Sequence, residues 1–313
     1  MKLYSKLEEV FDKKIPQILT IGNFDGVHLG HLFVLQRVQA IAKQSDAEIT
    51  VLTFSNHPSE VLRPQDPAKL LCTLPHKIKL LESNHVNHLF LIPFTNYLAK
   101  HSAASFVERI RQFIPFSHLI LGHDATLGRD RQGNRLVMQS LAEMWGFEVH
   151  YLDEYRYEGL AVSSTSIRKL VQEGDLKKVH ALLGRPYSIY STISSGLGKG
   201  RQMGYPTANI EVQNLCLPPF GVYAVEIKKG QEILPGIANL GFAPTIRQDN
   251  IPLLEVHILT DQTEFSEEPI EVIFQQYIRP EKKFENVEQL RSQIRQDIEL
   301  IKADQNKIQT LDF

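Results

Sequence analysis

The sequence is short of cysteine, of net charge and of long hydrophobic runs, and each shortage excludes a class of protein. Its two cysteines, Cys72 and Cys216, lie far apart and form no C-x-x-C pair, which argues against a disulfide scaffold or a cysteine-ligated zinc site. Lysine and arginine total 34 against 36 acidic residues, for a formal net charge of -2. We therefore expect no nucleic acid as a partner, although a small phosphorylated ligand would need only a local pocket.

Membrane insertion and export are also not expected. No stretch approaches the roughly 18 apolar residues that a membrane-spanning helix requires, and the start "MKLYSKLEEVFDKK" has charges where a signal peptide has its apolar core. The 313 residues, of which 42% are hydrophobic and 22% charged, are typical of a globular protein with about two domains. We predict a cytoplasmic protein that is a monomer or a weak oligomer.

The pattern of the chain changes near residue 184, and we predict one domain over residues 1–183 and another over 184–313. In the first part, the apolar runs "IPQILTIG", "EITVLTF", "HLFLIPF" and "HLILGHD" alternate with helical patterns, such as "LGHLFVLQRVQAIAKQ" and "SAASFVERIRQFI". Alternation of strand and helix predicts an α/β domain of Rossmann-like type, with a parallel sheet covered on both faces.

The second part is dominated by strands. The segments "YSIYSTIS", "GVYAVEIKKG", "ILPGIANLG", "LLEVHILT" and "IEVIFQQYI" are separated by glycine and proline turns, which is typical of an antiparallel barrel or sandwich. The end of the chain places apolar residues at helical spacing, namely Val287, Leu290, Ile294, Ile298 and Ile301. These residues predict a terminal helix that packs on the barrel.

The stretch "GNFDGVHLGH" joins the first predicted strand of the α/β part to its first helix. Backbone N–H groups at such a helix start attract phosphate, and His28 and His31 are spaced to face the same point. Gly30 between them removes a side chain that would block the approach of a phosphate. H-x-G-H alone is a weak signal, and a metal site is the other option, although the spacing lacks a recognisable array of further ligands.

A second candidate phosphate site is "SSTSIR", residues 163–168, at the start of another helical pattern. A serine or threonine here could do no more than cap the helix. Arg168, however, lies one turn into the helix, where its guanidinium could reach the same anion as the hydroxyl groups.

The strand-rich part has its own candidate nucleotide site in "GLGKGRQMGYPTAN". Flexible glycines let backbone amides surround a phosphate, and the loop carries the cations Lys199 and Arg201. Thr207 and Asn209 alternate on an extended segment, so both could hold a magnesium ion on ATP, although a simple turn entering a strand fits as well. Glu255 lies between apolar neighbours and is either turned to solvent or a general base.

Taken in order, these motifs together with "NLGFAPT", "LEVHIL" and "RPEKKF" resemble the prokaryotic bifunctional riboflavin kinase/FAD synthetase family over residues 15 to 303. The resemblance implies an N-terminal FMN adenylyltransferase domain and a C-terminal riboflavin kinase barrel. ATP with Mg²⁺ would phosphorylate riboflavin to FMN in the barrel, and a second ATP would convert FMN to FAD in the α/β domain.

The resemblance also implies roles for particular residues. Glu255, His28, His31 and Arg168 would be catalytic, and Thr207 and Asn209 would hold the metal. Flavin would be bound by Asp124, Asn239, Arg279 and Phe284. ATP and its phosphates would be bound by Gly22, Asn23, Phe24, Asp25, Gly30, Ser164, Thr165, Gly198, Lys199, Gly200 and Arg201; for Asp25, capping of the turn is an equal alternative.

One motif departs from the family. Where the family has the pattern G-x-D-F-x-F-G, this chain has "GHDATLG", with Ala125 and Leu127 in place of the two aromatic residues. The change removes packing surface rather than a catalytic group. Two alternatives therefore remain: a riboflavin kinase whose N-terminal domain is inactive, and a flavin-binding carrier without catalysis.

Overall fold

The computed structural model describes residues 1–9, 14–193, 204–242, 251–260 and 268–309, with side chains up to residue 303. Contacts divide the chain into two units. Unit 1 comprises Met1–Ile167 and Leu182–Gly184, and unit 2 comprises Arg168–Ala181 and Arg185–Phe313. The boundary between residues 183 and 184 stays a prediction, because contacts assign most of the preceding helical segment to unit 2.

Unit 1 is built on a six-stranded sheet with the order β1-β4-β3-β2-β5-β6. All five strand pairs are parallel, as the alternation of strand and helix predicts. The strands are β1 (Lys2–Tyr4), β2 (Gln17–Ile21), β3 (Glu48–Phe54), β4 (His88–Ile92), β5 (Phe116–Leu121) and β6 (Glu148–Tyr151).

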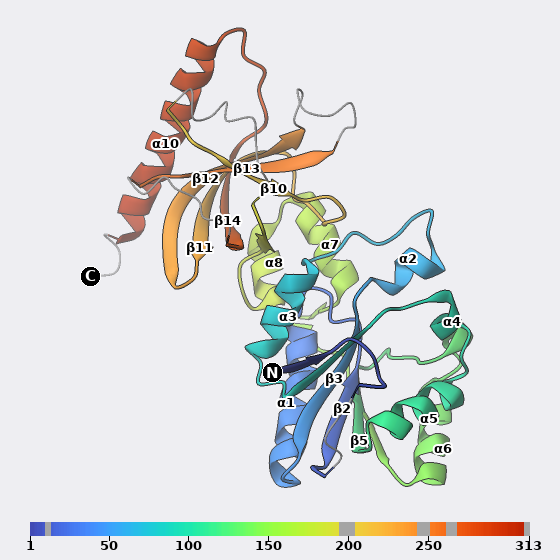
Figure 1. The fold of residues 1–313 in the computed structure, drawn as a ribbon. Coiled ribbons are helices and arrows are strands. Elements are labelled where there is room, and N and C mark those ends of the chain that lie inside the picture. Colours follow the sequence, from blue (N-terminus) through green and yellow to red (C-terminus); the bar gives the residue numbers. More distant parts are fainter. Residues whose placement is uncertain (10–13, 194–203, 243–250, 261–267, 310–313) are drawn as a thin grey trace. The chain divides into compact units, whose positions relative to one another are not determined.

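Helices cover both faces of this sheet (Figure 1). They are α1 (Leu29–Gln44), α2 (Pro58–Leu62), α3 (Leu74–Glu82), α4 (Asn96–Ala99), α5 (Ala103–Phe113) and α6 (Arg135–Trp145). Helix α1 buries Leu35, Val38 and Ala42, three of the apolar residues that predict it. It packs with α3 on one face, while α5 and α6 cover the other.

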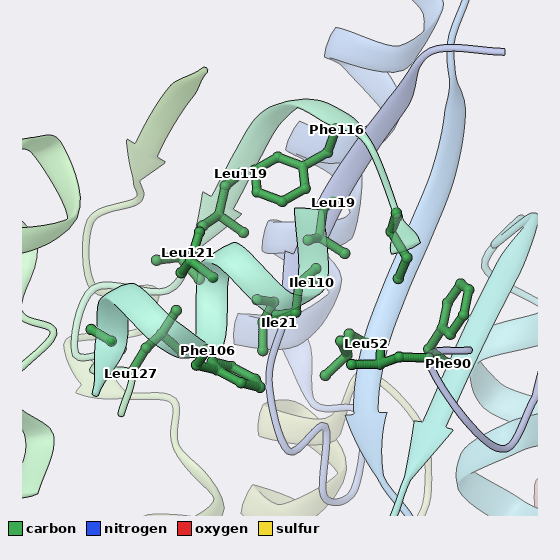
Figure 2. Packing of buried hydrophobic residues seen from close by; sticks show 14 of the residues in the cluster. Leu19, Ile21, Leu52, Phe90, Phe106, Ile110, Phe116, Leu119, Leu121 and Leu127 are labelled. Carbon is green, nitrogen blue, oxygen red and sulfur yellow. The ribbon is translucent and has the colours of Figure 1, made fainter. Parts of the chain in front are cut away.

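The alternation of side chains along the strands separates the two apolar layers. In β2, Ile18 belongs to the layer beneath α1, whereas Leu19 and Ile21 point to the layer beneath α5. Figure 2 shows this second layer, in which Phe106 and Ile110 of α5 meet the strand residues. Burial on both faces explains why these strands read as continuous apolar runs.

The order of strands places a switch point beside β2. The chain runs outward from β2 through β3 to β4 and then returns to add β5 on the opposite side of β2. In open parallel sheets, ligands bind at such a point, outside the carboxyl ends of the strands. The loop that leaves β2 at this edge carries the predicted phosphate-binding sequence.

A hairpin of β7 (Arg156–Tyr157) and β8 (Leu160–Ala161) leads to the helices α7 (Ser164–Glu173) and α8 (Leu176–Leu183). Unit 2 then forms a second six-stranded sheet with the order β10-β13-β12-β11-β14-β9. Its strands are β9 (Ser188–Ser191), β10 (Ala208–Glu211), β11 (Gly221–Lys229), β12 (Glu232–Phe242), β13 (Pro252–Ile258) and β14 (Ile270–Arg279).

Every pair in this second sheet is antiparallel, as expected for the barrel of the strand-rich part. The terminal helix α10 (Val287–Gln309) packs Ile298 and Ile301 against Val222 and Ile237 of the sheet. These findings confirm the predicted architecture of an α/β domain followed by a β domain with a final helix. Over the parts of the chain that the structure describes, no helix is both long and apolar enough to cross a membrane.

Candidate functional sites in the two units

The loop that leaves β2 has an unusual backbone. Phe24, Gly26 and Val27 all have positive φ angles, of 51°, 78° and 37°. Only glycine adopts this region without cost, and a β-branched residue there is an outlier that surrounding contacts must hold in place. Phe24 and Val27 are both buried. Strain of this kind is found at ligand sites, and here it lies at the switch point of the sheet.

His28 and His31 cap the first turn of α1 reciprocally. The backbone N–H of His31 donates to Nδ1 of His28 over 3.3 Å, and the N–H of His28 donates to Nδ1 of His31 over 3.4 Å. The two rings stack with centroids 3.7 Å apart. Since each Nδ1 accepts a backbone N–H, the proton of each neutral ring is on Nε2. Nε2–H is therefore the donor that each imidazole can offer to an anion.

Gly30 is required by its immediate neighbours. A Cβ at this position would lie 3.2 Å from ring atoms of His28 and 3.2 Å from the carbonyl oxygen of Val162. From the sequence, Gly30 was expected to leave room for phosphate. The structure shows a nearer reason, which is that the glycine leaves room for the His28 ring.

The start of α7 is tied to the same loop. Ser163 and Ser166 exchange backbone-to-hydroxyl hydrogen bonds of 3.1 Å, so Ser163 is the residue that caps this helix. The hydroxyl of Ser164 donates instead to the carbonyl oxygen of Asp25, 3.1 Å away. The start of α7 is thus joined by a direct hydrogen bond to the loop that precedes α1, within unit 1.

Lys77, a buried lysine for which the sequence predicted no role, fixes the loop through two hydrogen bonds. The ammonium of Lys77 donates to the carbonyl oxygens of Asn23 and Phe54, at 3.2 and 2.8 Å. Burial lowers the pKa of Lys77, and the nearby Cys72 and Asp25 oppose that change. The Asp25 carboxylate accepts the N–H of Leu71 at 2.9 Å, which ties the loop to a segment that is distant in the sequence.

These groups line a small cavity at the carboxyl ends of β2 and β3. Its lining comprises Asn23, Asp25, Ser55, Asn56, His57, Leu70, Cys72, Leu74 and Lys77. Cys72 is buried, and its sulfur accepts the backbone N–H of Gly26 at 3.3 Å. Polar side chains and backbone groups therefore converge at the edge of the sheet where open parallel folds bind ligands.

The remaining predicted residues of this part are less closely placed. Thr165 is exposed, and the side chain of Asp124 is 75% exposed beyond the end of β5. Arg168 belongs to unit 2, so its approach to the histidines stays a prediction. In the divergent motif, Leu127 is buried in the apolar layer of α5 (Figure 2). Ala125 packs against the same layer. Leu127 therefore keeps a packing role there.

In unit 2, strand register gathers four predicted residues into one lateral row. Glu255 of β13 pairs with Asn209 of β10 on one side and with Asn239 of β12 on the other. Asn239 then pairs with Val222 of β11, which pairs with Arg279 of β14. Directly paired residues share a face of a sheet. The carboxylate is accordingly flanked by two amides on the face where Val222 meets α10.

The far end of this row is fixed by an ion pair. Arg279 makes a bidentate contact with Asp297 of α10, with its closest nitrogen 2.8 Å from the carboxylate, and Asp297 is 1% exposed. The same guanidinium lies 5.9 Å from the ring centre of Phe284. Asn239 donates to Glu281 over 3.5 Å. Of the flavin-binding residues predicted for this unit, Asn239 and Arg279 thus belong to the row, and Phe284 lies beside it.

A histidine of β13 fixes the segment that leads into β10. His257, on the same face of β13 as Glu255, hydrogen-bonds through Nδ1 to the carbonyl oxygen of Pro206 at 2.8 Å. Burial lowers the pKa of His257, and this hydrogen bond opposes the shift. Thr207 follows Pro206 and is exposed. Gly198, Lys199, Gly200 and Arg201 lie outside the described residues.

Comparisons with known proteins match both units. A family model described as FAD synthetase matches residues 11–166, and one described as riboflavin kinase matches residues 183–304. Proteins named bifunctional riboflavin kinase/FMN adenylyltransferase are similar over almost the whole chain. The Listeria monocytogenes protein is 34% identical, covering 90% of this chain and 90% of its own; the Haemophilus influenzae protein is 36% identical, covering 91% and 93%.

A solved structure has the same fold. The crystal structure titled as a macrolide-efflux protein from Streptococcus pneumoniae superposes with a TM-score of 0.80, covering 96% of this chain and 98% of that one. The two sequences are 24% identical, so this likeness concerns the fold alone.

Proposed function

This chain belongs to the bifunctional riboflavin kinase/FMN adenylyltransferase family, and on that premise we propose that its two units make FAD from riboflavin in two ATP-dependent steps. Unit 2 would transfer the γ-phosphoryl group of ATP to riboflavin, giving FMN and ADP. Unit 1 would transfer the adenylyl group of a second ATP to FMN, giving FAD and pyrophosphate. The observation that carries the proposal for unit 1 is the reciprocal histidine cap.

For the adenylyl transfer, negative charge develops on the pyrophosphate leaving group. The Nε2–H groups of His28 and His31 are donors at the positive end of α1, where fixed dipoles stabilise such charge. Their orientation is set before substrate binds, because the cap and the ring stacking fix both imidazoles. Ser164 is joined to the same loop, and we include it, Thr165 and Arg168 in the group that binds the phosphates.

For the kinase step, Glu255 would accept the proton of the ribityl hydroxyl as that oxygen attacks phosphorus. The neighbouring donor set fits Mg²⁺, because Thr207, Asn209 and Glu255 offer only oxygen ligands. Thr207 and Asn209 would hold the ion, which would neutralise charge on the ATP phosphates. Asn239, Arg279 and Phe284 would position the flavin.

Neither alternative from the sequence is favoured. The family matches extend over both units, which does not favour a kinase with an inactive N-terminal domain, and the divergent Leu127 retains its place in the apolar layer. A cytoplasmic location and the absence of a nucleic-acid partner stay predictions. The presence of only two cysteines, far apart in the sequence, supports the former, and the small net charge of -2 supports the latter.

The proposal is tested by chromatography of the flavins formed from riboflavin, ATP and Mg²⁺. Formation of FAD supports both steps, FMN alone would limit activity to unit 2, and unchanged riboflavin and FMN would indicate a carrier. His28→Asn separates capping from catalysis, since asparagine is a good N-cap but lacks the Nε2 donor. We expect this variant to make FMN normally and FAD about a hundredfold more slowly.

The kinase site has a corresponding variant. Glu255→Gln keeps the size of the side chain and removes the base, so FMN formation should fall by at least about a hundredfold. Conversion of supplied FMN to FAD should continue at the wild-type rate. If either variant, while folded, lost both reactions, the assignment of one reaction to each unit would be wrong.

A further inference from the structure

Two histidines and a glutamate converge on one point at the edge of the sheet of unit 1, away from the predicted phosphate loop. His118 lies on β5, and Glu148 and His150 lie on β6, the strand at the end of the sheet. The register pairs His118 with Glu148, and His150 follows two residues later on the same face. These residues have no role in the function proposed above.

The three potential ligand atoms form a nearly equilateral triangle. Nδ1 of His118 and Nε2 of His150 are 3.3 Å apart, Nδ1 of His118 and Oε2 of Glu148 are 3.5 Å apart, and Nε2 of His150 and Oε2 of Glu148 are 3.3 Å apart. In a tetrahedral zinc site with bonds of about 2.0–2.1 Å, neighbouring ligand atoms lie about 3.3 Å apart. The triangle thus has the dimensions of three corners of that tetrahedron.

We propose that His118, Glu148 and His150 form a binding site for a divalent d-block cation, Zn²⁺ in the first place. Two imidazoles and one carboxylate suit zinc and disfavour Mg²⁺ or Ca²⁺, which prefer all-oxygen sites. Among the residues that the structure describes, no further histidine, cysteine or acidic side chain joins the group. The fourth position therefore takes water.

The surroundings are compatible with a bound ion. His150 is 28% and His118 18% exposed, so an ion can reach the site from solvent, and His150 lines a cavity of about 330 Å³. Burial lowers the pKa of His150, which favours the neutral, ligating form of the ring. Arg37 opposes a cation electrostatically, and the Glu148 carboxylate offsets that charge.

A bound ion would join β5 to the edge strand β6. Among the described strands, β6 has only β5 as a neighbour, so a metal bridge would restrain an edge strand that has a single partner. The expected consequence is a higher unfolding temperature of the protein in the presence of Zn²⁺, without a change in either catalytic rate.

The test is calorimetric titration of the full chain with Zn²⁺ in a buffer that does not chelate metals and without nucleotide. We expect one tight equivalent in the wild type and at least tenfold weaker binding in His118→Ala and in His150→Ala. His180→Ala is the matched control, because His180 is an exposed histidine of α8, and its variant should bind as the wild type does. Unchanged riboflavin kinase and FAD-forming rates in all variants would show that they are folded.

Two further measurements make the test decisive. Co²⁺ in place of Zn²⁺ should give the intense visible absorption of four-coordinate cobalt. Glu148→Gln should weaken this absorption, and because the Glu148 side chain is 67% exposed, the substitution should not disturb the fold. Equal zinc affinity in the wild type and in both histidine variants would overturn the proposal. So would the absence of a tight equivalent, which would mean that the three groups only share hydrogen bonds.

Discussion

Lys77 donates one hydrogen bond to the carbonyl oxygen of Asn23 over 3.2 Å and thereby connects α3 to the strained loop after β2. Its second bond, to Phe54, fixes the end of β3 against the same loop. A lysine that is only 7% exposed is rare, and burial penalises its charge. We infer that the cost is offset by these bonds, which hold the predicted nucleotide loop in its high-energy conformation.

Lys77→Met should therefore impair FAD formation in particular. Removing a buried donor costs about 1–3 kcal/mol, and a loop released from its φ-positive conformation would bind ATP roughly tenfold more weakly. The measurement is the KM for ATP and kcat of FMN adenylylation, with riboflavin phosphorylation by the same chain as the internal control. Lys77→Arg, which keeps charge and donors, should recover part of the affinity. Equal loss in both variants and both reactions would indicate general destabilisation instead.

Gly30→Ala should displace the ring of His28. The new methyl group would lie 3.2 Å from that ring and from the carbonyl oxygen of Val162, a crowding that the helix start can relieve only by moving. We expect FAD formation to fall by about tenfold or more while FMN formation is unchanged. Gly122→Ala is the matched control, since the nearest atom to its added Cβ is 4.0 Å away. If both alanine variants behaved alike, crowding at His28 would not be the cause.

The sequence predicted the elements that have strong periodicity. Helix α1 extends over Leu29–Gln44, as predicted, because its apolar spacing and the glycine turn before it agree. The short strand β1 and the helices α2, α3 and α4 were not predicted. In α3 the start signals were present, with Thr73 as N-cap and proline in the first turn, but its apolar stripe is weak and includes a buried lysine. Residue type alone assigns lysine to the surface.

The site residues were predictable as types but not as a constellation. The row of Asn209, Glu255 and Asn239 depends on the register of three strands, which no local pattern specifies. The triangle of His118, Glu148 and His150 likewise joins strands that are far apart in sequence. Lys77 and His257 act through backbone carbonyl groups, and such contacts leave no sequence motif.

Asp297→Asn should lower the free energy of unfolding of unit 2 and weaken its binding of riboflavin. The carboxylate is 1% exposed and forms a bidentate pair with Arg279, and breaking a buried pair costs about 3–5 kcal/mol. Without its partner, Arg279 would no longer be fixed beside Phe284, so the KM for riboflavin should rise. Urea unfolding and riboflavin kinetics measure the two effects. Glu299→Gln, at an exposed position of the same helix, should change neither; a normal KM in Asp297→Asn would remove Arg279 from the flavin site.

The stability of unit 2 should decrease on acidification because of His257. Burial lowers its pKa in the folded state below the unfolded value of about 6.5. Between those two values the unfolded chain binds more protons than the folded chain, so the free energy of unfolding rises with pH in this window. The contribution of His257 to stability is therefore lost progressively as pH falls below about 6.5. His257→Asn keeps a donor for the Pro206 carbonyl oxygen but does not titrate.

Urea unfolding at about pH 7.5 and about pH 5.5 should therefore show a smaller loss of stability in His257→Asn than in the wild type. Burial also lowers the pKa of His150 in unit 1, which adds a pH dependence of the same sign. His150→Asn serves as the comparison, and its effect should be confined to the transition of unit 1. An identical pH slope in the wild type and His257→Asn would show that this histidine contributes no linkage.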